Sequence, residues 1–364
     1  MSVQFGQGAY PDRKHIQSNR YALGNLSAAA HGAATGKRKR RDVANFLLNP
    51  EPELLTLQRE LISGEYATGE YRTFMVHDPK PRHISAAPFR DRVVHHALTN
   101  VLEPIFERRF SPYSFACRKG FGVHKAPDRA QHGMREYPYC LKVDVRKYFA
   151  SIDHEILNGQ LARVVKCKPT LALAAKIIAG SNEQEDVVSY FPGDDLFTPH
   201  GRRRGLPLGN QSSQFFANLY LNGLDHSLVG ELKAVFYVRY VDDLIFFANS
   251  KGDLHCALAA IEDGLRKVRL AMHPGKSKVY STAEGVTFLG WRLFPGRARL
   301  AHGNVARFAL RLKRIQQDFG QGQVDWPVIK TRIQAWIGHA SYGPTWGLRE
   351  RLFDRCAFGA GVRP

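Results

Sequence analysis

Three aspartates have the type and spacing that phosphoryl transfer from a nucleoside triphosphate requires. Asp144 lies in a segment that alternates like a β-strand, and Asp242 and Asp243 follow about a hundred residues later between two apolar segments. Two Mg²⁺ ions about 3.5–4 Å apart, bound by carboxylate oxygens, activate an attacking hydroxyl and stabilise a leaving pyrophosphate. A single Asp at a strand end is more often a cap or turn residue. The prediction therefore depends on all three carboxylates meeting.

One strand and a hairpin must position these carboxylates. In the segments 140–145 and 234–238, residues suited to a buried face alternate with residues suited to an exposed face. This alternation predicts a β-strand in each segment, with one face in the core. A further strand is expected at 244–248, so Asp242 and Asp243 lie at the tip of a hairpin. Because such strands alternate with helical segments, the sequence predicts an α+β domain.

Apolar residues at helical spacing predict the main helices. One helix begins at Arg90 and is expected to end or bend at Pro104. A second helix is expected over 212–224. A helix near the C-terminus is expected to begin after the capping residue Asp325 and to place Trp336 in the core. The helix before that one has its basic residues largely outside an apolar stripe of Val305, Phe308, Leu312, Ile315 and Phe319.

The chain is strongly basic. Its 364 residues include 52 lysines and arginines against 33 aspartates and glutamates, a net charge of +19. A nucleic-acid backbone is the natural partner, because neutralising phosphates releases counterions. A basic protein that binds ribosomes or lies against a membrane would have the same charge. The basic run 37–41 is interpreted as a solvated tail, a nuclear signal or an RNA contact.

The remaining composition predicts a soluble protein of a reducing cytoplasm. The five cysteines are widely spaced without a CxxC pair, which predicts neither a zinc site nor a disulfide framework. The N-terminus lacks the apolar core of an export signal, and no apolar stretch is long enough to cross a membrane. His95 and His96 have no cysteine or acidic partners at ligand spacing, so we interpret them as ordinary helical histidines.

The tetrapeptide Tyr240–Asp243, inside an apolar hairpin, resembles the palm signature of reverse transcriptases. The similarity extends from about Tyr71 to about Leu352. It implies an RNA-directed DNA polymerase with dNTPs, a template RNA and a cDNA or primer strand as its partners. Other segments resemble motifs of this family in the same order: 80–84 and 89–93 of the fingers, 114–120, 141–149 around the first catalytic aspartate, 273–278 with the motif lysine, and the primer-grip turn 288–291.

The resemblance also implies a right-hand polymerase fold. An antiparallel palm sheet with helices would be followed by a small helical thumb. The expected divisions are a basic N-terminal extension over 1–50, fingers over 51–140, a palm over 141–298 with a fingers insertion at about 160–205, and a thumb and tail over 299–364.

The expected metal site holds two Mg²⁺ ions, for which Mn²⁺ can substitute. Asp144 and Asp242 would ligate both ions, and Asp243 would be a weaker ligand or would orient the other carboxylates. The resemblance also places Val145 in the metal-binding set.

Five further side chains are expected to bind the nucleotide, to protonate the leaving group or to select the sugar. Arg82 and Lys80 would pair with the triphosphate, since a guanidinium fork suits phosphate oxygens. Lys276, or Lys278 if the register shifts, could protonate the leaving pyrophosphate as a general acid. Each of these basic residues could instead be a solvated surface charge. Phe149 matches the aromatic gate that collides with a ribose 2′-hydroxyl, which implies selection of deoxynucleotides.

Residues 208–214 depart from the pattern of most reverse transcriptases. They read Leu-Gly-Asn-Gln-Ser-Ser-Gln in place of Gln-Gly-x-x-x-Ser-Pro. Together with 215–222 and 335–340, this segment resembles the reverse transcriptases of diversity-generating retroelements. The residues expected beside the incoming nucleotide are Leu208, Gly209 and Gln214.

Leu208 predicts low fidelity. A leucine supplies packing at the nascent base pair but no hydrogen bond, and discrimination by shape alone is worth only about 1–3 kcal/mol. The resemblance implies errors mainly opposite template adenines, for which the chemistry of Leu208 gives no physical route. It further implies a template-repeat RNA, a small basic oligomeric accessory protein, and a bacterial cell in which the host or a phage encodes the enzyme.

Alternative functions remain open. A retron or phage-defence reverse transcriptase is disfavoured by Leu208 and Gln214, and an intron-type protein by the lack of a maturase-length extension after residue 352. A noncatalytic RNA-binding protein on a polymerase scaffold is disfavoured because all three aspartates and Phe149 are present. Phe149 also argues against an RNA-dependent RNA polymerase.

Overall fold

The computed structural model describes residues 21–77, 81–181, 187–232, 236–354, 356 and 358. The chain divides into two compact units, each assembled from several chain segments. Unit 1 consists of Met1–Arg118, Val145–Lys233 and Ala259–Pro274, and unit 2 consists of Lys119–Asp144, Ala234–Leu258 and Gly275–Pro364. In the described part of the chain, no helix is both long enough and apolar enough to cross a membrane.

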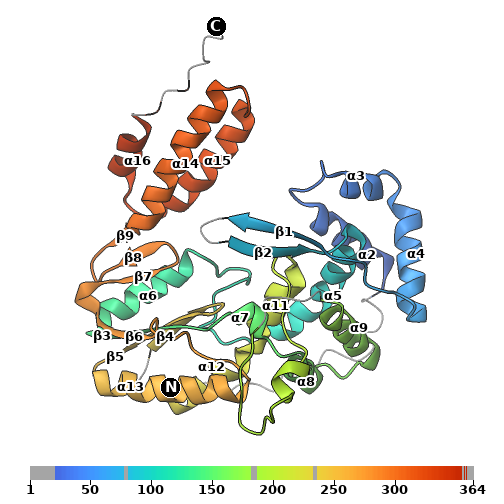
Figure 1. Ribbon diagram of the computed structural model, residues 1–364, viewed down its shortest axis with the longest axis horizontal. Helices are drawn as coiled ribbons and strands as arrows, with labels where there is room; N and C mark the ends of the chain where they lie inside the picture. Colours follow the sequence, from blue (N-terminus) through green and yellow to red (C-terminus); the bar gives the residue numbers. More distant parts are fainter. Residues whose placement is uncertain are drawn as a thin grey trace. The chain divides into compact units, whose positions relative to one another are not determined.

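Unit 1 is mostly helical, with one antiparallel hairpin (Figure 1). The hairpin consists of β1 (Arg72–His77) and β2 (Pro81–Ala86). The helices are α2 (Leu23–Ala34), α3 (Arg41–Leu48), α4 (Pro50–Ser63), α5 (Phe89–Glu107), α7 (Tyr148–Ser151), α8 (His154–Val164), α9 (Lys168–Ala179), α10 (Thr198–Gly201), α11 (Gln211–Tyr220) and α12 (Asn222–Glu231). A further helix, α13 (Lys251–Lys267), begins in unit 2 and ends in unit 1.

Helix α5 forms the centre of unit 1 and packs against α2 and α11. Val94 and Leu98 of its predicted apolar face are buried. The helix was expected to end or bend at Pro104; an end at this residue is wrong, because α5 continues to Glu107, and a bend there stays a prediction. Proline removes one backbone donor, and burial of the following residues Ile105 and Phe106 holds the last turn in place.

The single helix expected over 212–224 is in fact two helices. Helix α11 ends at Tyr220 and α12 begins at Asn222. The Asn222 side chain accepts a hydrogen bond from the Ser111 backbone N–H (3.1 Å) and donates to the Arg109 carbonyl (3.1 Å). These contacts with a distant loop fix the turn between the two helices, which local helical spacing cannot reveal.

Unit 2 contains a four-stranded antiparallel sheet of order β4-β5-β3-β6. The predicted strands are present, with bounds shifted by one or two residues; Ala234 and Val235 of the first expected hairpin strand lie outside the described residues. Helix α6 packs against β4 and β5 so closely that a Cβ on Gly133 would lie 2.7 Å from the Phe247 ring. The elements are α6 (Lys125–Glu136), β3 (Tyr139–Asp144), β4 (Phe236–Tyr240), β5 (Asp243–Ala248) and β6 (Lys278–Ser281).

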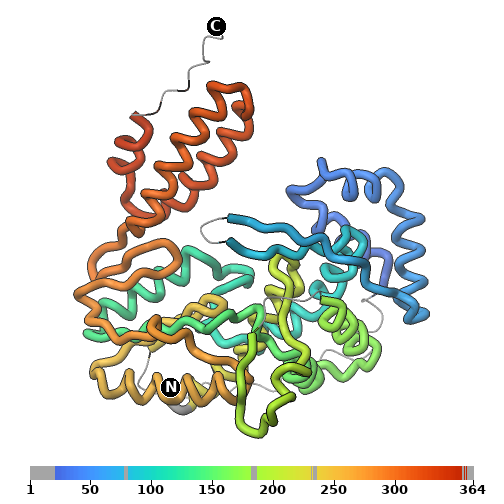
Figure 2. The backbone as a smooth tube through the Cα atoms, in the orientation of Figure 1, coloured from blue at the N-terminus to red at the C-terminus, as the bar shows by residue number. Residues whose placement is uncertain are grey.

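The rest of unit 2 is a meander followed by helices, drawn from orange to red in Figure 2. The indole of Trp336 is 8% exposed and stacks on Phe308 with ring centroids 3.8 Å apart, so its predicted core position is confirmed. Helix α15 begins directly after Asp325, but the predicted capping bond is absent, since this side chain accepts none from the helix. The elements are η1 (Thr282–Glu284), β7 (Val286–Phe288), β8 (Trp291–Leu293), β9 (Ala298–Leu300), α14 (His302–Gly320), α15 (Trp326–Ala340) and α16 (Trp346–Phe353).

Candidate active site

Two of the three predicted aspartates lie opposite each other in the sheet of unit 2. Asp144, the last residue of β3, is the register partner of Asp243, the first residue of β5. Directly paired residues of antiparallel strands present their side chains on the same face. The next pair inward, Val143 and Leu244, is fully buried and fixes this register. The fold therefore brings together two carboxylates that are about a hundred residues apart in sequence.

The third aspartate lies in the turn of the β4–β5 hairpin. Tyr240 pairs with Asp243, which leaves Val241 and Asp242 as a two-residue loop. Val241 has a φ of +57°, a conformation that is strained for a β-branched residue. The fully buried Arg239 donates from Nη1 to the Val241 carbonyl (3.1 Å). This contact holds the turn that carries Asp242.

Two lysines balance the paired carboxylates. Lys276 Nζ lies 2.8 Å from Asp144 Oδ2, and this pair is half-exposed. Lys142 Nζ lies 3.3 Å from Asp243 Oδ1 and also donates to the Thr287 carbonyl (2.9 Å). Lys142 and Asp243 thus form an ion pair, and Asp243 Oδ1 is buried without a well-formed hydrogen bond.

The pKa of Asp243 responds to this environment. The pKa of Asp243 is raised to about 6, and burial is the largest cause, since desolvation disfavours the charged form. The Lys142 ammonium opposes this rise, while the charges of Asp242 and Asp144 contribute to it. Asp144 and Asp243, with Asp242 close by, thus lie in a partly desolvated site. A cation bound there would favour the ionised form of each carboxylate.

The donor atoms fit a hard divalent cation. All are carboxylate oxygens, which Mg²⁺ prefers, and Asp243 Oδ1 has an unused acceptor position. Within the residues that the structure describes, however, no three His, Cys, Asp or Glu side chains already converge as an ion site. Val145 follows Asp144 in sequence, but its contacts place it in unit 1, where it forms an isolated bridge with Met272. Its role as a ligand stays a prediction.

Unit 1 contains the residues predicted to bind the nucleotide. Phe149 is half-buried in α7 with its ring 5.7 Å from Tyr148, and its carbonyl accepts a hydrogen bond from the Leu206 N–H (2.8 Å). The Leu208 carbonyl accepts from the Ser85 N–H at the end of β2 (3.1 Å). The structure thus links the segment 206–210 both to α7 and to β2.

Glycine is required in that segment at one position. Gly209 has a φ of +117°, and a Cβ there would lie 3.2 Å from Ile84. Gln214, on the exposed side of α11, accepts a hydrogen bond from the Cys117 thiol (3.5 Å). Arg82 is exposed on β2, whereas Lys80 lies outside the described residues. Binding of a nucleotide by these residues stays a prediction.

Sequence reasoning missed two residues of the carboxylate site. Lys142 precedes Asp144 by two residues, and the period of a strand puts such residues on one face, so this signal was present in the sequence. Arg239 gave a weaker signal, as a charged residue within an apolar strand. Lys278, the alternative to Lys276, pairs with Lys142 in the sheet, whereas Lys276 is the lysine that contacts Asp144.

The chain resembles several known proteins. It is 24% identical to Protein YkfC of Escherichia coli over 295 residues, which cover 70% of this chain and 74% of that protein. The identity is 26% over 174 residues with a putative COX1/OXI3 intron 1 protein of Saccharomyces cerevisiae, covering 46% of this chain but 20% of the yeast protein. It is 32% over 96 residues with nuclear intron maturase 1 of Arabidopsis thaliana, covering 26% of this chain and 14% of the maturase.

A family profile gives broader coverage than the relatives do. The profile described as "Reverse transcriptase (RNA-dependent DNA polymerase)" matches residues 77–293, more than half of the chain. The matched segment contains Asp144, Asp242, Asp243 and Lys276. The chain therefore belongs to the reverse transcriptase family, whose members are RNA-directed DNA polymerases.

Proposed function

We propose that this protein copies an RNA template into DNA at the carboxylate site of unit 2. The observation that carries the proposal is the register of β3 and β5, in which Asp144 lies opposite Asp243. Asp144, Asp242 and Asp243 would hold two Mg²⁺ ions, and Mn²⁺ could take their place. When bound, these ions would activate the primer 3′-hydroxyl and stabilise the leaving pyrophosphate.

The chain's own residues would bind the nucleotide, select the deoxyribose sugar and protonate the leaving group. In the reaction a bond forms between the 3′-oxygen and the α-phosphorus, and the bond from that phosphorus to pyrophosphate breaks. Lys276 is suited to protonate the leaving pyrophosphate, since its ammonium already lies against Asp144 and is half-exposed. Arg82 would bind the triphosphate, and Phe149 would exclude a ribose 2′-hydroxyl.

Primer extension tests the polymerase. The purified chain is supplied with an RNA template, a DNA primer, Mg²⁺ and all four dNTPs. The wild type should extend the primer, and the double variant Asp242→Ala, Asp243→Ala should not. The variant Asp318→Ala changes a carboxylate on α14, outside the site, and should stay active. If the wild type binds RNA but makes no DNA with either metal, the protein is a noncatalytic RNA-binding protein.

The cDNA is proposed to be error-prone, as in a diversity-generating retroelement. The support is Leu208 in place of glutamine, on a segment fixed to β2 through Ser85. A leucine side chain packs but cannot hydrogen-bond, which limits discrimination to about 1–3 kcal/mol, or roughly tenfold to two-hundredfold. The proposed template is a template-repeat RNA, with a small basic oligomeric accessory protein as partner. Because both proteins would be cationic, RNA would bridge them.

Sequencing of the cDNA tests the fidelity proposal separately. The wild type should make errors concentrated at template adenines, and Leu208→Gln should reduce the error frequency. Leu196→Gln is the matched control, because Leu196 is 68% exposed and outside the 206–210 segment. Faithful cDNA from the wild type would leave the polymerase intact and would favour a retron, intron-type or phage-defence enzyme.

A further inference from the structure

The short helix α7, which carries Phe149, depends on its surroundings for its conformation. It has four residues and no side-chain cap, and Lys147 before it has a φ of +44°, which is unfavourable for a residue other than glycine. So short a helix is not stable alone, because nucleation costs more free energy than so few hydrogen bonds contribute. The position of the Phe149 ring is therefore set by what the rest of unit 1 places against α7.

The segment 203–206 lies along α7 and bonds to its backbone. The Phe149 carbonyl accepts a hydrogen bond from the Leu206 N–H (2.8 Å). At the other end of the segment, the Arg203 carbonyl accepts from the His154 N–H (3.1 Å). A shift of this segment would therefore move the backbone of Phe149 with it.

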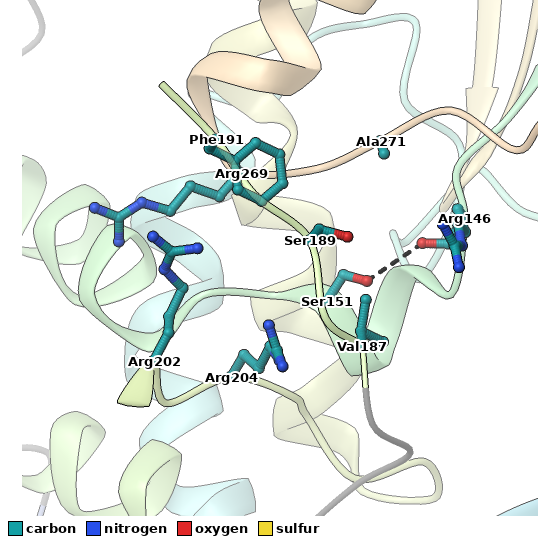
Figure 3. A pocket seen from close by; sticks show the side chains of 9 residues that line it. All are labelled: Arg146, Ser151, Val187, Ser189, Phe191, Arg202, Arg204, Arg269 and Ala271. Atoms are coloured by element: carbon teal, nitrogen blue, oxygen red, sulfur yellow. Dashed lines mark hydrogen bonds between the residues drawn. The ribbon is translucent and has the colours of Figure 1, made fainter. Parts of the chain in front are cut away.

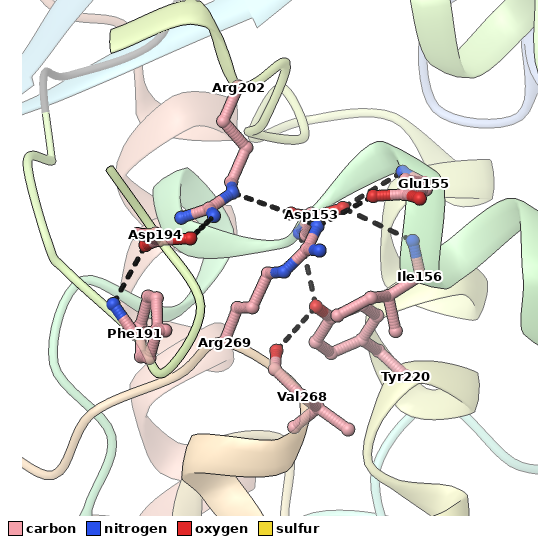
Figure 4. Close-up of polar contacts among 9 residues, drawn as sticks. All are labelled: Asp153, Glu155, Ile156, Phe191, Asp194, Arg202, Tyr220, Val268 and Arg269. Atoms are coloured by element: carbon pink, nitrogen blue, oxygen red, sulfur yellow. Dashed lines mark hydrogen bonds and ion pairs between the residues drawn. The ribbon is translucent and has the colours of Figure 1, made fainter. Parts of the chain in front are cut away.

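A network of buried ion pairs around Asp153 joins α7 to that segment (Figure 4). The Asp153 side chain is 1% exposed, and its Oδ2 accepts from Arg269 Nη1 (2.8 Å) and lies 3.4 Å from Arg202 Nε. Arg202 directly precedes the segment 203–206, is 6% exposed and also pairs with Asp194. The pair of Asp153 with Arg202 thus connects the chain just after α7 to the beginning of the segment.

Further contacts leave Asp153 little freedom to move. Its Oδ1 accepts from the N–H groups of Glu155 (2.9 Å) and Ile156 (3.1 Å), which caps α8. Its own N–H donates to the buried Tyr220 hydroxyl on α11 (3.2 Å), which in turn donates to the Val268 carbonyl (2.7 Å). Asp153 is therefore a fixed point against which the chain of α7 is held.

Arg269 connects the same carboxylate to the chain before α7. It has a φ of +54°, and its ion pair with Asp153 helps to hold this unfavourable backbone conformation. Two residues later, the Ala271 carbonyl accepts from the Arg146 N–H (2.9 Å). The Arg146 carbonyl accepts from Ser151 Oγ at the end of α7 (3.3 Å), beside a small pocket that four arginines line (Figure 3): Arg146, Arg202, Arg204 and Arg269.

We propose that Asp153, Arg202 and Arg269 are positioning residues for sugar selection. Together they hold α7 so that the Phe149 ring stays where a ribose 2′-hydroxyl would collide with it. They act through Phe149, so the inference rests on the proposed role of that ring as the gate. A buried ion pair suits this task, because loss of one partner leaves the other charge buried and unpaired, which strongly disfavours the original arrangement.

Single-nucleotide primer extension tests the proposal on the full chain. For each variant, kcat/KM is measured for a dNTP and for the matching rNTP, and the ratio of the two gives the sugar selectivity. A merely structural defect lowers both values and leaves the ratio unchanged, whereas a displaced ring raises the relative use of the rNTP. Selectivity by shape is worth roughly tenfold to two-hundredfold, so Arg202→Gln should lower the ratio by about tenfold.

Three further variants separate positioning from folding. Arg269→Gly removes the ion pair with Asp153 but adopts a positive φ without strain, so it should fold and lower the ratio by about threefold or more. Arg266→Gln changes an exposed arginine on the last turn of α13 and should keep the wild-type ratio. In Phe149→Val, which lacks the ring, adding Arg202→Gln should change the ratio by less than about twofold, because residues that act through one group are not additive.

The outcomes distinguish the positioning role from the gate. An unchanged ratio in both Arg202→Gln and Arg269→Gly overturns the positioning role while the gate stands, and so does an equal effect of Arg202→Gln with and without the Phe149 ring. An unchanged ratio in Phe149→Val contradicts the gate itself, and the positioning role falls with it.

Discussion

The buried His95 should make the protein sensitive to mild acid. His95 lies on α5, is 1% exposed, and its Nδ1 is 3.2 Å from Ser212 Oγ on α11. Its pKa is lowered from 6.5 to about 3, mainly by burial and to a smaller extent by the charges of His96 and Arg92. The imidazole therefore stays neutral in the folded chain at a pH at which the unfolded chain binds a proton.

The size of the effect follows from linkage. Because the folded pKa lies below the unfolded value, this contribution to stability is complete above about pH 6.5 and is lost as the pH falls. With pKa values of 6.5 and about 3, lowering the pH from 7.5 to 5.0 costs about 2 kcal/mol of unfolding free energy, at ~1.36 kcal/mol per unit. A folded pKa one unit higher changes this result by only about 0.1 kcal/mol.

Urea denaturation at the two pH values measures the loss. His95→Asn retains a group that can bond to Ser212 but cannot titrate, so its loss of stability between pH 7.5 and 5.0 should be smaller than that of the wild type by about 2 kcal/mol. His255→Asn changes an exposed histidine on α13 and should behave like the wild type. Equal pH dependence in the wild type and His95→Asn would refute the reasoning.

Three further predictions concern the core and the proposed chemistry. Trp336→Ala should destabilise the protein by about 3–5 kcal/mol in urea denaturation, because it removes a stacked buried ring, whereas Trp346→Ala should cost less than about 1 kcal/mol because that ring is 71% exposed. Lys276→Ala should lower kcat in primer extension about 10²–10⁴-fold, as expected for loss of a general acid. Lys267→Ala changes an exposed lysine on α13 and should leave kcat unchanged; equal rates for Lys276→Ala and the wild type would rule out the proton-transfer role. Phe149→Val should increase ribonucleotide incorporation in a competition assay, and unchanged sugar selectivity would contradict its role as a gate.

Local patterns identified most of the elements that carry the site. The alternation of 140–145 placed Asp144 on a strand, and the strand expected at 244–248 placed Asp242 and Asp243 at the tip of a hairpin. The structure confirms β3, β5 and the turn that holds Asp242, and it makes Asp243 the first residue of β5. Lys276, predicted from its motif, contacts Asp144. These predictions succeeded because strand periodicity depends on burial of one face, which is written in consecutive residues.

Other features depended on contacts that periodicity does not encode. The break between α11 and α12 results from hydrogen bonds of Asn222 to a loop more than a hundred residues away. The continuation of α5 beyond Pro104 depends on burial of Phe106. Such long-range contacts override local propensity, so helix ends were predicted less well than helix positions.

The sequence by itself determined the residue types of the site, the strands that carry them, and the basic charge that favours a nucleic-acid partner. Only the tertiary structure decided that Asp144 lies opposite Asp243 and that Lys142 and Lys276 balance them. It alone gathered four arginines from separate segments around one pocket. The physical reason is that a strand's faces follow from its own residues, whereas strand register and the meeting of distant charges follow from how the whole chain packs.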